Sequence, residues 1–201
     1  MNQHTRSFPR PSTQAAEGVP RWSWTVAEFD RLIELGVLRE EDDVELIGGE
    51  MVPMSPKGAR HDNVRNELVD WFYRRLPAGL KLACEPGWRA SETEYCEPDL
   101  LVHRADSLAT SVAPEAVLLL VEVADSSLSY DLKIKAAKYA SLGVPEYWVI
   151  DVKRRVAHIH RQPGVGGYGS VRKLGARQRL VPAAVPEIAV SLTDIDSVAG
   201  T

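Results

Sequence analysis

The sequence predicts a mixed α/β domain with a central sheet, helices on its faces and β-hairpins at its edges. Two apolar runs, residues 100–102 and 117–123, are typical of buried strands. A segment with helical periodicity follows the second run, and a further predicted strand, PEYWVIDV (residues 145–152), follows that segment. A strand, a helix and a strand in this order predict two parallel strands joined by a right-handed crossover.

The N-terminal end differs in composition from the rest of the chain. Residues 1–20 are polar and contain three prolines, so they bury little and predict a disordered tail. The remaining residues, 21–201, are enough for a single domain with a sizeable core. Thr25 and Glu28 have the spacing of a capping box and predict the start of a helix that ends at Gly36.

Two glycine-containing turns predict the hairpins. The Gly48-Gly49 dipeptide accepts the positive φ angles of a tight hairpin. The glycine-rich segment 163–170 lacks the lysine of a phosphate loop and is typical of a hairpin connection. Between these turns, the spacing of apolar residues predicts a helix over 60–76, and short strands then lead to the run at 100–102.

A helix that carries several lysines follows the second apolar run. Its start is predicted at one of three serines, Ser126, Ser127 or Ser129, and its end at Gly143. Its buried stripe is predicted to consist of Leu132, Ala136, Tyr139 and Ala140. Lys135 borders this stripe, so its alkyl chain can pack while its ammonium group reaches the rim.

Two acidic residues lie in these apolar strands. Glu122 is the one charged residue in the run 117–123, and burying an ionised carboxylate is unfavourable unless it is paired or binds a metal. Asp99 stands at the start of the other run after Pro98, which suits the first residue of a strand because it has no N–H for the ladder. If the two strands are neighbours, the carboxylates converge, and such hard oxygen ligands suit Mg²⁺ or Mn²⁺.

Several motifs occur in a fixed order along the chain: ELIGGEMVPMSP, a following His61, EPDLLV, LLLVEVADSS, YDLKIKAAKY and GVPEYWVID. Together they resemble the Uma-two family of restriction endonucleases, within the PD-(D/E)XK nuclease superfamily. The resemblance covers most of the chain and implies a restriction-endonuclease-like mixed sheet flanked by helices. It also implies that Asp99 and Glu122 hold Mg²⁺ or Mn²⁺, and we expect the backbone carbonyl of Val123 as a further ligand.

One position departs from the superfamily pattern. That pattern has a lysine two residues after the glutamate, where this chain has Ala124. In the Uma-two pattern a lysine of the next helix supplies the cation, and Lys135, four residues after Asp131, matches it. Two alternatives stay open: Asp131 and Lys135 form an ordinary surface ion pair, or Lys133 or Lys138 supplies the charge.

His61 falls in the first turn of the helix predicted over 60–76. A histidine at such a position is typical of a core or capping residue. The resemblance instead implies a neighbour of the active site that orients phosphate or water.

Composition and charge limit the classes of function. No apolar run approaches the ~20 residues that cross a membrane, and the first 20 residues have no apolar segment of a signal peptide. We therefore expect a cytoplasmic protein without a membrane partner. The formal net charge of −4 is unusual for a protein that binds nucleic acid, so a local basic patch must contact phosphate. Candidate residues for this patch are Arg60, Arg65, Arg74 and Arg75.

The resemblance and the acid pair together predict a Mg²⁺-dependent endonuclease that hydrolyses DNA phosphodiester bonds. The expected catalytic residues are Asp99, Glu122, Lys135 and His61, with Lys135 orienting the attacking water or stabilising the transition state. One alternative is a catalytically inactive binding or scaffold domain on the same fold. Another is a phosphatase, for which no nucleophile motif is present. The sequence leaves open whether DNA or RNA is cut and whether the protein is a homodimer.

Overall fold

The computed structural model describes residues 21–195, which group into two compact units. The segments of the two units are 21–54 with 89–96, and 55–88 with 97–195. The disordered tail predicted for residues 1–20 lies outside the described residues. The prediction of a single domain over 21–201 stays a prediction.

Most elements of the structure are strands, and only a few are helices within the described residues. The helices are α1 (Val26–Glu34), α2 (Ala59–Tyr73), α3 (Leu128–Tyr130) and α4 (Ala136–Ser141), with a π-helical turn, Asp131–Lys135, between α3 and α4. Short 3₁₀ turns lie at Glu40–Asp42, Pro114–Ala116 and Pro186–Ile188. The strands are β1 (Val44–Ile47), β2 (Glu50–Pro53), β3 (Leu80–Cys84), β4 (Trp88–Ser91), β5 (Glu94–Cys96), β6 (Leu100–Arg104), β7 (Leu119–Ala124), β8 (Glu146–Asp151), β9 (Val156–Gly164) and β10 (Gly167–Gly175).

The first unit contains α1 and a four-stranded sheet of order β2-β1-β5-β4. The predicted capping box is confirmed: the Glu28 N–H donates to the Thr25 hydroxyl oxygen at 3.2 Å, and the Thr25 N–H donates to the Glu28 carboxylate at 3.0 Å. The predicted hairpin is also confirmed, with φ of 62° at Gly48 and 78° at Gly49. The buried core of this unit consists of Val26, Phe29 and Leu46.

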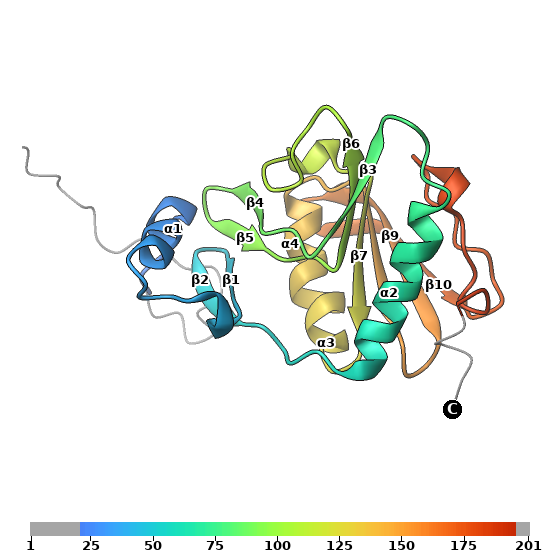
Figure 1. The fold of residues 1–201 in the computed structure, drawn as a ribbon, viewed down its shortest axis with the longest axis horizontal. Helices are drawn as coiled ribbons and strands as arrows, with labels where there is room; N and C mark the ends of the chain where they lie inside the picture. The colour runs from blue at the N-terminus through green and yellow to red at the C-terminus, as the bar shows by residue number, and fades with distance from the viewer. Residues whose placement is uncertain (1–20, 196–201) are drawn as a thin grey trace, which may run out of the picture. The chain divides into compact units, whose positions relative to one another are not determined.

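The second unit contains a six-stranded sheet of order β10-β9-β8-β7-β6-β3. β7 and β8 are parallel, as the strand–helix–strand order predicts, and the other pairs are antiparallel. Figure 1 shows α2 and α4 on opposite sides of β7. The alternation of side chains along the strands explains this arrangement, because successive residues point to opposite faces of a sheet. Trp148 packs in one cluster with Leu68 of α2, whereas the ring of its neighbour Tyr147 lies 5.0 Å from that of Tyr139 in α4.

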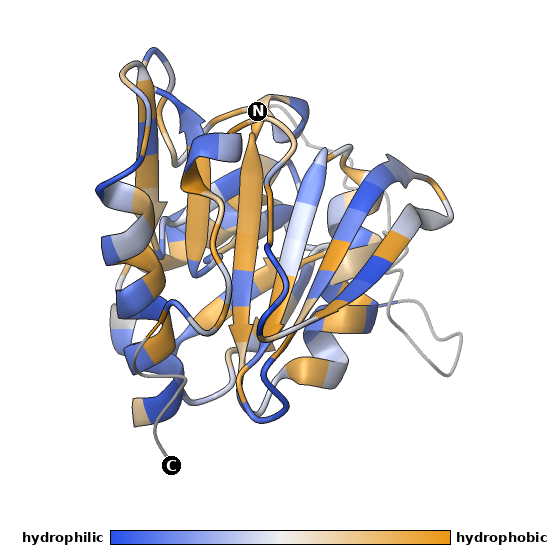
Figure 2. Ribbon diagram, turned by 90° about the vertical axis from the view of Figure 1, so that its right-hand side faces the viewer, coloured by the Kyte–Doolittle hydropathy of each residue, from blue (hydrophilic) through white to orange (hydrophobic). Residues whose placement is uncertain are grey.

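The middle of the sheet is fully buried. All six residues of β7 and all six of β8 are buried, so both strands read as nearly continuous apolar runs. In Figure 2 the strand at the centre of the view is hydrophobic apart from one hydrophilic band, whereas the hairpin at the end of the sheet carries alternating hydrophilic and hydrophobic bands. A charged side chain in the middle strands is therefore buried by its position in the sheet. Among the described residues, no helix has the length and apolar content needed to cross a membrane.

Candidate active site

Asp99 and Glu122 come from neighbouring strands of the six-stranded sheet. Asp99 directly precedes β6, Glu122 lies within β7, and Leu100 of β6 pairs with Val121 of β7. Both acids are buried, with exposed fractions of 3% for Asp99 and 5% for Glu122. The Val123 N–H donates to the Asp99 carboxylate at 2.7 Å, which fixes the aspartate against the end of β7. The condition set by the sequence, that the two strands are neighbours, is met.

The backbone around Val123 also directs a carbonyl oxygen toward the side of Asp99. The N–H and C=O of one strand residue point to the same side, so the Val123 carbonyl faces the side on which its N–H meets Asp99. Continuing the register of β6 and β7 by two residues puts Pro98 opposite Val123, and proline has no N–H to donate. The proline therefore ends the ladder next to the carbonyl predicted as a metal ligand.

Glu122 is contacted by side chains of the π-helical turn and of α4. The Lys135 Nζ lies 3.0 Å from Glu122 Oε1, and the Tyr139 hydroxyl donates to the same oxygen at 3.2 Å. The Lys135 side chain is 9% exposed, whereas Lys133 is exposed and Lys138 is half-buried. Of the candidate lysines, Lys135 therefore supplies the cation beside Glu122, and its catalytic role stays a prediction.

The sequence predicts Lys135 at the border of the buried stripe, with its ammonium group at the rim. This prediction is wrong, because the whole residue is buried. The physical reason is the π-helical turn, in which the Ala136 N–H donates to the Asp131 carbonyl five residues earlier. Both Asp131 and Lys135, at the ends of this turn, are buried. Ser127 takes the N-cap position, but its hydroxyl donates to the Asp131 carboxylate and makes no capping bond to the backbone.

His61 of α2 joins the same cluster from another direction. One ring nitrogen, Nε2, lies 3.1 Å from the Asp99 carboxylate, and the other, Nδ1, lies 3.1 Å from Asp62 Oδ1. Burial opposes protonation of His61, but the hydrogen bond and the charge of Asp99 outweigh it, so the pKa of His61 is raised. Burial raises the pKa of Asp99, but His61, the Val123 N–H and Lys57 together lower it by more. The pKa of Asp99 is therefore below its ordinary value.

Sequence reasoning missed Lys57 and Glu85. Lys57 Nζ lies 4.0 Å from Asp99 Oδ1 and also forms an ion pair with Glu85. Burial lowers the pKa of Lys57, but Glu85, Asp99 and Glu122 together raise it above its ordinary value. Glu85 has a φ of 46°, a conformation that non-glycine residues rarely adopt, and its N–H donates to the Asp99 carbonyl at 3.1 Å. Arg65 of α2 also forms an ion pair with the Glu85 carboxylate.

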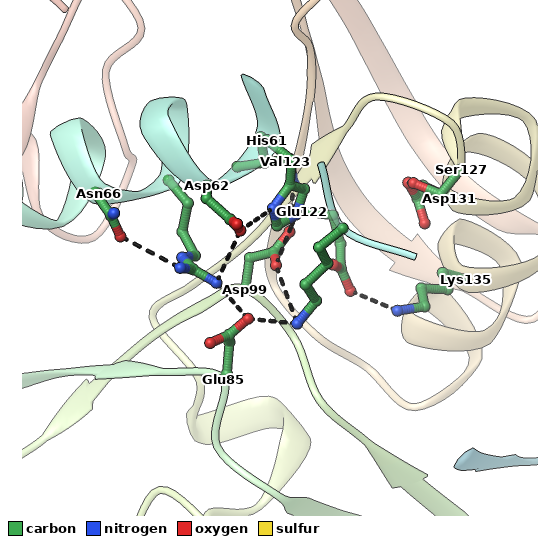
Figure 3. A network of polar contacts seen from close by, with 12 residues as sticks. His61, Asp62, Asn66, Glu85, Asp99, Glu122, Val123, Ser127, Asp131 and Lys135 are labelled. Carbon is green, nitrogen blue, oxygen red and sulfur yellow. Dashed lines mark hydrogen bonds and ion pairs between the residues drawn. The ribbon is translucent and has the colours of Figure 1, made fainter. Parts of the chain in front are cut away.

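One signal in the sequence marks Lys57: it stands between Pro56 and Gly58, directly before the helix that carries His61. Figure 3 shows the arrangement, with His61 and Val123 beside Asp99, Glu85 below them and Lys135 directed at Glu122.

The donors of this cluster fit a divalent cation. Asp99 and Glu122 offer hard carboxylate oxygens, and the Val123 carbonyl has no ladder donor from Pro98. Within residues 21–195, no group of three or more His, Cys, Asp or Glu side chains is arranged to hold a metal ion. Two carboxylates with waters and substrate oxygens are the usual shell of Mg²⁺, so a third acidic ligand is not required.

The fold and the cluster place the chain among the restriction-endonuclease-like proteins. The family Uma2, described as "Putative restriction endonuclease", matches residues 26–193, and the chain belongs to this family. Among solved structures, the crystal structure of a putative nuclease belonging to DUF820 from Anabaena variabilis ATCC 29413 is similar, with a TM-score of 0.69 and 17% sequence identity. The match covers 87% of this chain and 98% of that chain. No curated protein matches the chain.

These comparisons confirm two predictions, the family and the restriction-endonuclease-like fold with a mixed α/β sheet. Membership in the family supports a nuclease. The roles of Asp99, Glu122, Val123, Lys135 and His61 stay predictions.

Proposed function

We propose that this protein hydrolyses phosphodiester bonds of DNA with the help of Mg²⁺ or Mn²⁺, held by Asp99, Glu122 and the Val123 carbonyl. The observation that carries the proposal is the convergence of two buried acids with Lys135 at the end of two neighbouring strands. Membership in a family described as restriction endonucleases supports the same reaction class. When bound, the metal ion would lower the pKa of a water molecule and neutralise charge on the phosphate.

The residues of the chain hold this arrangement in place. The Val123 N–H orients the Asp99 carboxylate, and the Tyr139 hydroxyl orients that of Glu122. His61 is bound at both ring nitrogens, so its ring is fixed beside Asp99. Lys135 brings a positive charge to a site with little water, where it can orient the attacking water or stabilise the phosphorane-like transition state.

Plasmid cleavage with Mg²⁺, Mn²⁺ or EDTA tests the proposal. We expect nicking or cutting with either metal and none with EDTA. Asp99→Asn and Glu122→Gln should each abolish cleavage, and Lys135→Met should lower the rate by roughly 10²-fold, the scale for one preorganised transition-state group. Asp70→Asn is the matched control, because Asp70 forms an exposed ion pair on α2 and should be dispensable.

Metal binding measured by calorimetry gives a second result that does not depend on turnover. We expect wild-type protein to bind Mn²⁺ and both acid variants to lose this binding. Cleavage that is equal in the wild type and both acid variants would contradict the assignment of Asp99 and Glu122. Intact fold, absent metal binding and no cleavage of DNA or RNA would instead favour the catalytically inactive binding domain.

A further inference from the structure

The C-terminal part of the chain is basic although the chain as a whole is acidic. Residues 152–186 contain eight of the 24 Lys and Arg residues and none of the 28 Asp and Glu residues. This acid-free segment comprises β9, β10 and the loop that follows them. Such charge asymmetry is the electrostatic signature of a surface that meets a polyanion.

Three arginines of this segment line one cavity of about 330 Å³. Arg161 of β9 and Arg172 of β10 lie on one face of the hairpin, because Arg172 pairs with Ile159 and residues two apart on a strand share a face. Arg179 reaches the cavity from the following loop. Ile159 and Leu174 give the cavity an apolar floor against the core of the sheet.

The three guanidinium groups differ in whether a carboxylate neutralises their charge. Arg161 donates to the buried Glu146 carboxylate at 2.7 Å, and Arg179 lies 3.3 Å from Asp194. Within the part of the chain that the structure describes, the side chain of Arg172 has no hydrogen bond or ion pair. The positive charge of Arg172 is therefore available to a ligand, and Arg161 and Arg179 flank it.

The lining of the cavity indicates the class of ligand. Planar guanidinium groups match the oxygens of a phosphate in pairs, which a lysine cannot do. No aromatic side chain lines the cavity, so it offers no stacking surface for a nucleobase. Arg177, beside Gln178 of the lining, extends the positive charge along the loop, which suits a polymer of phosphates better than a single small anion.

We propose that the cavity formed by Arg161, Arg172 and Arg179 binds a backbone phosphate of the nucleic acid, outside the cluster of Asp99 and Glu122. This inference rests on the proposed function for the identity of the ligand. Of the four arginines that the sequence suggests for this role, three are engaged: Arg65 with Glu85, Arg74 with Asp70, and Arg75 over the ring of Trp71. The fourth, Arg60, is exposed in the first turn of α2 and does not line this cavity.

Binding of a fluorescent DNA duplex, measured in EDTA over a range of salt concentrations, tests the inference without cleavage. Loss of one phosphate contact should lower the salt slope by about 0.9 and weaken binding roughly five- to tenfold at 0.1 M salt. We expect this for Arg172→Gln, whereas Arg172→Lys should keep most of the salt slope because it keeps the charge. The single-turnover cleavage rate at saturating DNA should stay within about twofold of wild type, because the cavity contains no group of the acid cluster.

Arg74→Gln is the matched control, since it removes the same charge from an exposed arginine at the C-cap of α2. Equal weakening by Arg74→Gln and Arg172→Gln would overturn the inference, because it would show a general effect of net charge. Unchanged DNA binding by Arg172→Gln would also overturn it, even if inorganic phosphate, titrated separately, bound the cavity. Wild-type protein that binds no DNA, either in EDTA or with Ca²⁺ in place of Mg²⁺, would instead contradict the proposed function.

Discussion

Replacing Lys135 with methionine separates the contribution of its charge from that of its alkyl chain. Methionine fills a similar volume, so the packing beside Tyr139 is kept while Glu122 loses its cation. Glu122 is 5% exposed and would keep the hydrogen bond from the Tyr139 hydroxyl. Removing one partner of a buried ion pair typically costs about 3–5 kcal/mol. We therefore expect Lys135→Met to lower the free energy of unfolding by about 3 kcal/mol at pH 7.

Urea denaturation in EDTA, followed by tryptophan fluorescence, measures this loss as a shift of the midpoint. The double variant Glu122→Gln with Lys135→Met replaces the pair with neutral groups and should recover about 2 kcal/mol or more of the loss. Lys133→Met, an exposed position on the same helical segment, should change stability by less than about 0.5 kcal/mol. A loss below about 0.5 kcal/mol for Lys135→Met, or a double variant no more stable than the single one, would refute the buried pair.

Three further outcomes are expected. Gly49→Ala should destabilise the first unit by at least about 2 kcal/mol in thermal unfolding, because its φ is 78° and the added Cβ would lie 2.1 Å from Ser23 Oγ. Tyr139→Phe removes one hydrogen bond to Glu122 and should cost about 1 kcal/mol in urea denaturation, and no change would mean that the bond contributes nothing. Partial desolvation by neighbouring atoms and the charges of Glu85 and Asp99 raise the pKa of the solvent-accessible Cys84 thiol. Its alkylation at pH 8 should therefore be slower than that of an unstructured cysteine peptide, and an equal rate would contradict the shift.

Local signals in the sequence were enough to predict most of the fold. The capping box at Thr25, the hairpin at Gly48-Gly49 and the parallel pair around the lysine-bearing helix each depend on residues close together in the chain. The burial of Glu122 can also be predicted from its neighbours in the chain, because a single charge in a run of aliphatic residues must be buried with a partner.

The partners of Asp99 depend on contacts that the sequence does not encode locally. Glu85 reaches the cluster because β3 pairs with β6, which brings the residue after Cys84 beside Asp99. Lys57 reaches it from the loop before α2, whose sequence has no periodic pattern from which its path could be predicted. A register between strands and a loop path are properties of the folded chain, so neither residue could be assigned from spacing alone.

The π-helical turn was also beyond prediction, because the sequence of residues 131–135 has ordinary helical composition. The two residues at the ends of the turn, Asp131 and Lys135, are both buried. A lysine assigned to a helix border from a period of 3.6 is thus found inside the protein, next to the acid it was expected to serve.

The charges of the cluster bear on how metal and nucleic acid would bind. Apart from the pair of His61 and Asp62, the cluster contains three carboxylates and three cations, namely Asp99, Glu122, Glu85, Lys57, Lys135 and Arg65. The formal charges of these six residues cancel, so a divalent cation bound without a phosphate would add two positive charges to a partly buried site, which would weaken its binding. A phosphodiester at the same place would add a negative charge and reduce this excess. Under the proposed function, each of the two ligands would therefore strengthen binding of the other by the same factor.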